Sequence, residues 1–139
     1  MKARDKEFTI GKLAEQANVN VETVRFYERK GLIKQPNNAT GFRKYPEEDV
    51  FRIRFIKKTQ ELGFTLKEAK ELLELKVSKT AKCSTVKEKT ELKISEVELK
   101  IKDLRRIRKT LKNLSEACGR KNLSTTECPI LESFEKGIR

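Results

Sequence analysis

Three cysteines, Cys83, Cys118 and Cys128, are the residues of this chain whose type and spacing point most directly to chemistry. Cys83 and Cys118 bracket a stretch that contains neither glycine nor proline. If residues 84–117 form one helix, it is roughly 50 Å long at ~1.5 Å per residue, so the thiols at its ends cannot share a ligand within one chain. A second copy packed antiparallel would place each Cys83 beside the partner subunit's Cys118, with Cys128 close by. Three converging thiolates suit a soft metal ion.

The donor set restricts which metals fit such a site. The chain has no histidine, which excludes mixed nitrogen and sulfur coordination. Structural zinc usually takes four ligands, so three sulfurs leave a Zn(II) site incomplete. Hg(II) and Pb(II) are soft enough for three thiolates, and Cd(II) can add a fourth ligand. Two other interpretations stay open: the cysteines could form a regulatory disulfide, and Cys118 could be a buried apolar residue.

The segment that separates the thiols has the apolar spacing of a coiled coil. Ser84 is a good N-cap, which puts Cys83 just before the helix N-terminus, where backbone N–H groups attract negative charge. Apolar residues recur in steps of three and four at Ile94, Val97, Ile101, Leu104, Ile107, Leu111, Leu114 and Cys118. Such a helix needs a partner, so we expect a homodimer joined by an antiparallel coiled coil.

The N-terminal half predicts a helix-turn-helix followed by a short hairpin, or wing. Thr9 can cap a first helix, and Asn20 a second over residues 21–30, which Gly31 ends. Their expected inner faces carry Ile10, Leu13, Ala14 and Ala17 in the first helix, and Val21, Val24 and Phe26 in the second. The wing would pair residues 32–33 with residues 42–45 across a turn over residues 36–41.

Two further helices are expected before the long one. Pro46 suits the first turn of a helix that runs to Leu62 and ends at Gly63. Thr65 and Glu68 form a capping-box pattern for a helix from residue 66 to about residue 75. The predicted organisation is therefore mainly α. A winged helix-turn-helix domain (1–75) is followed by a linker (76–84), a dimerisation helix (85–118), and a metal-binding loop with a short C-terminal helix opened by Pro129 (119–139).

The second predicted helix has the side chains of a DNA-recognition helix. Glu22, Thr23 and Arg25 lie near its N-terminus, where polar groups reach base edges, and Tyr27, Arg29 and Lys30 follow, where donors reach phosphates. In the wing, Arg43 and Lys44 sit between Phe42 and Tyr45, which suits backbone or minor-groove contact. We therefore expect double-stranded DNA as a partner.

The composition agrees with a polyanionic partner and excludes several other classes. The chain of 139 residues carries 33 basic against 21 acidic side chains, a net charge of +12. No secretory signal and no run approaching the ~20 apolar residues of a membrane span are visible, so we expect the cytoplasm and no membrane. An odd number of cysteines argues against a disulfide framework. No catalytic constellation is recognisable, so we expect no enzyme.

Several motifs resemble the MerR family of bacterial transcription regulators over nearly the whole chain. The most specific is Arg25-Phe26-Tyr27-Glu28 with Gly31-Leu32. The runs over residues 10–14, 41–45, 55–57 and 62–66 extend the likeness. Cys83, Cys118 and Cys128 match the three cysteines of the mercury-responsive branch, in which the first cysteine of one subunit and the other two of its partner hold the metal.

The resemblance also bears on the metal and on the mechanism. The copper-type branch carries serine where this chain has Cys83, and zinc-type members carry extra Cys and His near position 118. Lead and cadmium sensors share the three-cysteine plan, and the loop from Cys118 to Cys128 is about one residue longer than in familiar mercury sensors. The resemblance implies a homodimer that switches a promoter from repression to activation on binding Hg(II). It would do so by distorting the DNA for RNA polymerase. Regulators of Pb(II), Cd(II) or Zn(II) and a thiol-redox sensor are the alternatives.

Overall fold

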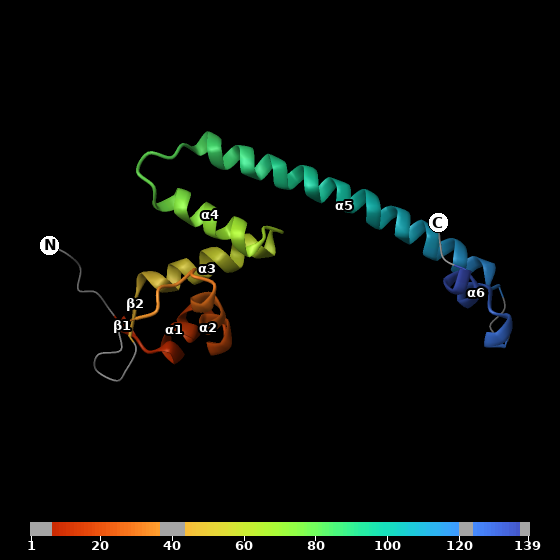
Figure 1. The fold of residues 1–139 in the computed structure, drawn as a ribbon, viewed down its shortest axis with the longest axis horizontal. Coiled ribbons are helices and arrows are strands. Elements are labelled where there is room, and N and C mark those ends of the chain that lie inside the picture. The colour runs from red at the N-terminus through yellow and green to blue at the C-terminus, as the bar shows by residue number, and fades with distance from the viewer. Residues whose placement is uncertain (1–6, 37–43, 120–123, 137–139) are drawn as a thin grey trace. The chain divides into compact units, whose positions relative to one another are not determined.

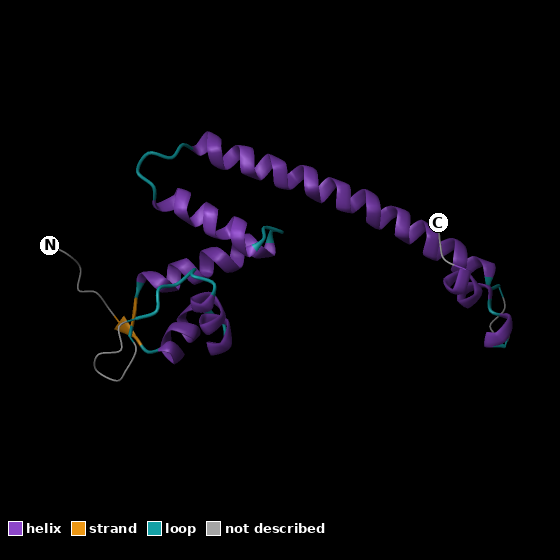
Figure 2. Ribbon diagram, viewed as in Figure 1, coloured by secondary structure: helices purple, strands orange, loops and turns teal. Residues whose placement is uncertain are grey.

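The computed structural model describes residues 7–36, 44–119 and 124–136. Helices dominate these residues (Figure 2), which confirms the expected mainly α fold. The chain divides into two compact units, Met1–Thr90 and Glu91–Arg139. The elements, labelled in Figure 1, are β1 (Glu7–Phe8), α1 (Ile10–Ala17), α2 (Val21–Arg29), β2 (Tyr45–Pro46), α3 (Glu48–Glu61), α4 (Leu66–Val77), α5 (Cys83–Ala117), η1 (Thr125–Glu127) and α6 (Pro129–Lys136).

The first two helices begin where their caps predict. The Thr9 side chain accepts a hydrogen bond from the Lys12 N–H, and the Asn20 side chain accepts one from the Thr23 N–H. Asn18 turns the chain between the helices in the left-handed conformation, with φ 58°, which asparagine tolerates better than most residues. Gly31 follows α2 with φ 75°, a conformation that strains any residue with a Cβ. Local chemistry thus accounts for the helix-turn-helix.

The two short strands correct the predicted wing. β2 pairs antiparallel with β1, so that Tyr45 lies opposite Phe8 and not opposite residues 32–33. Leu32 and Ile33 are consecutive and both buried in the core, whereas neighbouring residues of a strand point to opposite faces. The turn over residues 37–43 lies outside the described residues. Pro46 belongs to β2, so α3 begins two residues later than predicted.

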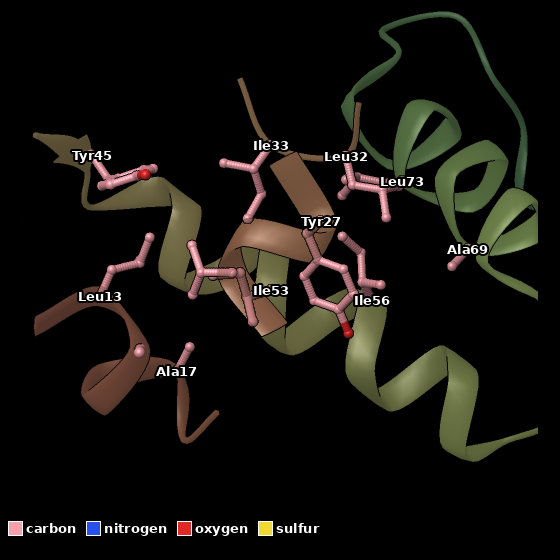
Figure 3. Packing of buried hydrophobic residues seen from close by; sticks show 12 residues of the cluster. Leu13, Ala17, Tyr27, Leu32, Ile33, Tyr45, Ile53, Ile56, Ala69 and Leu73 are labelled. Carbon is pink, nitrogen blue, oxygen red and sulfur yellow. The ribbon is translucent and has the colours of Figure 1, made fainter. Parts of the chain in front are cut away.

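Helix α3 forms the centre of the hydrophobic core (Figure 3). Ile53 and Ile56 on α3 are fully buried against residues of α1, α2 and α4. The turn from α3 to α4 passes through Gly63, and the predicted capping box is present: the Thr65 hydroxyl accepts from the Glu68 N–H at 3.1 Å, and the Glu68 carboxylate accepts from the Thr65 N–H at 2.8 Å. The helix ends at Val77, two residues beyond the prediction.

Helix α5 confirms the long helix but corrects its start. It begins at Cys83, so Cys83 and Ser84 lie in its first turn and Ser84 is not its N-cap. The helix has 35 residues, a length of about 52 Å at ~1.5 Å per residue. Beyond it, α6 begins at Pro129 as predicted, and the single helical turn η1 precedes it.

Asp49, in the first turn of α3, carries a buried carboxylate. It is 4% exposed, and the nearest Arg52 guanidinium nitrogen lies 3.9 Å from its carboxylate. Burial raises the pKa of Asp49 to about 6, helped by the negative charges of Glu48 and Glu28 and opposed by the positive charge of Arg52. The folded state therefore binds this proton more tightly than the unfolded state, whose carboxyl has a pKa near 3.8.

Asp49→Asn should stabilise the protein more at pH 7 than at pH 4.5. Ionisation of Asp49 lowers the free energy of unfolding as the pH rises between the two pKa values, and asparagine does not ionise. The gain at pH 7 should exceed the gain at pH 4.5 by about 2 kcal/mol, measured by urea unfolding of the reduced, metal-free protein. An equal effect at both pH values, or a larger loss at pH 7, would contradict the buried-carboxyl assignment.

Candidate DNA-binding helix and thiol sites

Helix α2 presents one face outward because the opposite face is buried. Val24 is fully buried and Tyr27 is 4% exposed. Residues three and four positions apart share a helix face, so this burial turns Glu22, Arg25, Phe26 and Arg29 away from the core. The predicted inner position of Phe26 is therefore wrong, since its side chain is 38% exposed. Tyr27 occupies the inner position predicted for Phe26.

The polar residues at the start of α2 form interactions of different strength with their neighbours. The Thr23 hydroxyl donates to the Asn20 side chain at 2.8 Å, so it also serves the helix cap. An Arg25 guanidinium nitrogen lies 3.5 Å from the Glu22 carboxylate, and both side chains are more than half exposed. An exposed ion pair of this kind contributes little, so it does not prevent Arg25 from reaching a nucleic acid. Arg25 is thus available for a base edge.

Two tyrosines that the sequence assigned to DNA contact lie in the core. Tyr45 is fully buried, and its hydroxyl donates to the Glu28 carboxylate at 2.6 Å. The Tyr27 hydroxyl donates to the Gln60 side chain at 3.2 Å, and burial raises the pKa of Tyr27. DNA contact by Tyr27 and Tyr45 stays a prediction. In the protein alone both rings pack in the core, where a buried tyrosine satisfies its hydroxyl internally.

The remaining predicted DNA contacts lie at the surface or outside the described residues. Lys30 is exposed at the end of α2, and Lys44 is exposed just before β2. Phe42 and Arg43 lie outside the described residues. Among the described candidates, those outside the core are Glu22, Thr23, Arg25, Lys30 and Lys44.

Two basic side chains of α3 donate hydrogen bonds to backbone carbonyl groups in the segment before α2. No role was predicted for them from the sequence. The Lys57 ammonium donates to the Asn18 carbonyl at 3.1 Å, and the Arg54 guanidinium donates to the Gln16 carbonyl. Positive charge is favoured near the carbonyl groups at a helix C-terminus, which here is the end of α1. These bonds join residues 38 and 39 positions apart, so no local pattern could have revealed them.

The three thiols all lie near helix ends. Cys83 is the exposed first residue of α5, and Cys118 is half-buried directly after its last residue. Cys128 is half-buried and directly precedes Pro129, the first residue of α6. None of the three, all within the described residues, forms a disulfide. Helix N-termini attract negative charge, so Cys83 and Cys128 occupy positions that suit metal-bound sulfur.

A capped helix pair with an outward basic face, attached to a long helix with thiols at both ends, defines a helix-turn-helix DNA-binding protein with a separate thiol element. Comparison with known proteins gives its family. Residues 8–76 match the model described as MerR HTH family regulatory protein, and residues 50–114 match the model described as MerR, DNA binding. The chain belongs to the MerR family, whose members are DNA-binding transcriptional regulators and not enzymes.

Curated relatives and solved structures are similar to this chain over almost its full length and almost all of their own. A mercuric resistance operon regulatory protein from Bacillus cereus is 45% identical over 94% of this chain and 98% of its own. A dual-function regulator, MerR, from Bacillus megaterium, solved in complex with mercury(II), is 42% identical over 92% of this chain and 99% of its own, with TM-score 0.65. A regulator from Ralstonia metallidurans, solved with lead(II), is 34% identical over 91% of this chain and 98% of its own, with TM-score 0.80. Among the described residues, no helix combines the length and apolar character that crossing a membrane requires.

Arg25→Ala should weaken operator binding by about 1–3 kcal/mol and relax specificity at one base pair, because the role predicted for Arg25 is to donate to a base edge. The measurement is fluorescence anisotropy at fixed salt, on an operator selected from random duplexes.

Arg106→Ala is the matched control for this substitution. Arg106 lies on α5 and, like Arg25, forms an exposed ion pair with an acidic residue three positions earlier, Asp103. The two substitutions therefore remove the same charge and the same kind of partner. Equal losses of affinity in both variants, with specificity unchanged, would mean that Arg25 contributes only general charge.

Proposed function

We propose that this protein is a metal-responsive transcription factor that binds double-stranded promoter DNA as a homodimer. On binding Hg(II) it switches from repressor to activator by distorting the DNA. The observation that carries the proposal is the uninterrupted helix α5, which separates Cys83 from Cys118 by about 50 Å along its axis. Thiols so far apart can bind one metal ion only if a second subunit supplies part of the site.

The surface of α5 supports pairing with a second copy. Its large apolar side chains Ile94, Val97, Ile101, Leu104, Ile107 and Leu111 are between 39% and 63% exposed. They follow the three and four spacing of a coiled coil, in which such residues are buried between two helices. In an antiparallel pair, Cys83 of one subunit lies beside the partner subunit's Cys118 and Cys128. Two equivalent sites result, one at each end of the paired helices.

The donor chemistry supports Hg(II) as the effector. Thiolates without histidine favour soft ions, and three of them satisfy Hg(II) or Pb(II). The named function of the Bacillus cereus relative and the mercury(II) complex of the Bacillus megaterium regulator support mercury first. The lead(II) complex supports Pb(II) as the alternative, with Cd(II) and Zn(II) further candidates of the same family.

The switch requires a difference in metal affinity between two states of the dimer on DNA. Metal must bind the DNA-distorting state more tightly than the repressing state, and a typical coupling between sites is ~1–3 kcal/mol. Bending or untwisting a duplex costs of the order of a few kcal/mol. Metal–sulfur bonds that join two subunits supply free energy on this scale. RNA polymerase then responds to the altered promoter geometry and not to the metal.

Mixed dimers test whether subunits share the site. A dimer of one Cys83→Ser subunit and one Cys118→Ser subunit should bind one Hg(II) with three thiolates, whereas neither homodimer should. In the mixed dimer, one site keeps Cys83 from one chain and both other cysteines from its partner. Differently tagged subunits are co-expressed and purified by both tags. The three-thiolate site is read from ultraviolet sulfur-to-metal charge-transfer bands.

A matched control has the opposite expectation. A dimer of wild-type protein with a Cys83→Ser, Cys118→Ser double variant has the same number of altered cysteines, but each shared site loses one ligand. It should show no three-thiolate band, whereas sites confined to single chains would leave one intact. A three-thiolate band in the control and none in the mixed dimer would contradict a site shared between subunits.

In vitro transcription from the protein's own operator tests the effector. Hg(II) should activate at a lower concentration than Pb(II), Cd(II) or Zn(II), because three thiolates match its preference. Diamide, which oxidises thiols to disulfides, should not activate, and mass spectrometry should show reduced cysteines in the Hg(II)-activated protein. Activation by diamide alone would identify a thiol-redox sensor, and activation by Pb(II) at the lowest concentration would identify a lead sensor.

A further inference from the structure

Phe26 is an aromatic side chain on the outward face of the DNA-recognition helix. It is 38% exposed, while its neighbours Val24 and Tyr27 are buried. On α2 it shares the outward face with Glu22 and Arg29, at spacings of four and three residues. The core already has an aromatic residue at the adjacent position, Tyr27, whose ring centroid lies 6.1 Å from that of Phe26. Core packing therefore does not account for the exposed part of the Phe26 ring.

Two cations lie over this ring. The Arg29 guanidinium carbon is 5.8 Å from the ring centroid, and the Lys30 ammonium is 5.6 Å from it. Cation–π attraction at an exposed site is weak, yet it keeps two positive charges beside one apolar surface. An apolar contact flanked by cations complements the major groove, where base edges lie between two rows of phosphates.

We propose that Phe26 is a specificity-determining residue that contacts the C5-methyl group of a thymine in the major groove, while Arg29 and Lys30 bind the flanking phosphates. Among the four bases of DNA, only thymine presents a methyl group there, and a phenylalanine ring is a suitable partner for it. This inference deepens the proposed function and rests on its assignment of α2 as the recognition helix. It adds an apolar readout to the polar one expected from Arg25.

The test starts with selection of binding sites from random duplexes by the reduced, metal-free full-length protein. Wild-type protein should enrich thymine at one symmetry-related position of each half-site. Phe26→Ala should lose this preference and keep the preferences at neighbouring positions. Phe51→Ala is the matched control, because Phe51 is an equally large, 45% exposed side chain that lies on α3. It should keep the thymine preference.

Uracil then isolates the methyl group, because uracil is thymine without it. Replacing the preferred thymine of one half-site by uracil should weaken wild-type binding about fourfold. This is the typical loss of affinity when the burial of one methyl or methylene group is removed. The same replacement should leave Phe26→Ala binding unchanged. Circular dichroism checks that the variants fold. If the alanine variant unfolds, Phe26→Leu replaces it, and the difference in its affinity for thymine and uracil operators should be smaller than the difference for wild-type protein.

Three results would overturn the inference. Wild-type protein could bind thymine and uracil operators equally, or the Phe26 variant could retain the thymine preference. The Phe26 variant could also lose affinity equally for all sequences, which would indicate contact with the deoxyribose backbone. Failure of wild-type protein to select any sequence would overturn the proposed function as well, so the two failures are distinguishable.

Discussion

The continuity of helix α5 is the constraint on which the proposed function depends. An α-helix advances by a nearly constant distance per residue, so 35 unbroken residues keep Cys83 away from Cys118. A flexible linker of the same length would let the thiols of one chain meet and would remove the need for a partner. In the proposed dimer, the stiffness of the helix makes metal binding and subunit pairing parts of one equilibrium, which is what a regulator that acts as a dimer requires.

In the N-terminal unit, the orientation of α2 depends on apolar packing and on a few hydrogen bonds. Asn20 sets where the helix begins, and Val24 and Tyr27 set which face points inward. Arg54 and Lys57 on α3 hold the carbonyl groups of the preceding turn. Any movement of α3 would therefore be passed to the turn that carries the recognition helix. For the proposed switch, these bonds offer a physical route from a movement of α3 to the DNA.

Elements that depend on local chemistry were predictable from the sequence. The caps at Thr9 and Asn20, the capping box of Thr65 with Glu68, and the stop at Gly31 each involve neighbours within four residues. Elements that depend on distant partners were not. The strand at Tyr45 pairs with β1, 37 positions earlier at Phe8, and so the predicted hairpin had the wrong partner. The start of α5 was missed by two residues, since Ser84 belongs to a favoured N-cap type but lies inside the first turn.

The amino-acid sequence by itself determined the helical elements, the long unbroken helix, the positions of the three thiols along it and the family. These follow from hydrogen bonds and periodicities that span a few residues. Only the tertiary structure decided which aromatic side chains serve the core and which face outward. Phe26 and Tyr27 are adjacent, and a helix turns by about 100° per residue, so the two rings leave the helix in different directions, and Tyr27 is the one that points into the core. In the core the Tyr27 hydroxyl donates to Gln60 on α3, a partner that a buried hydroxyl needs and that only folding brings near.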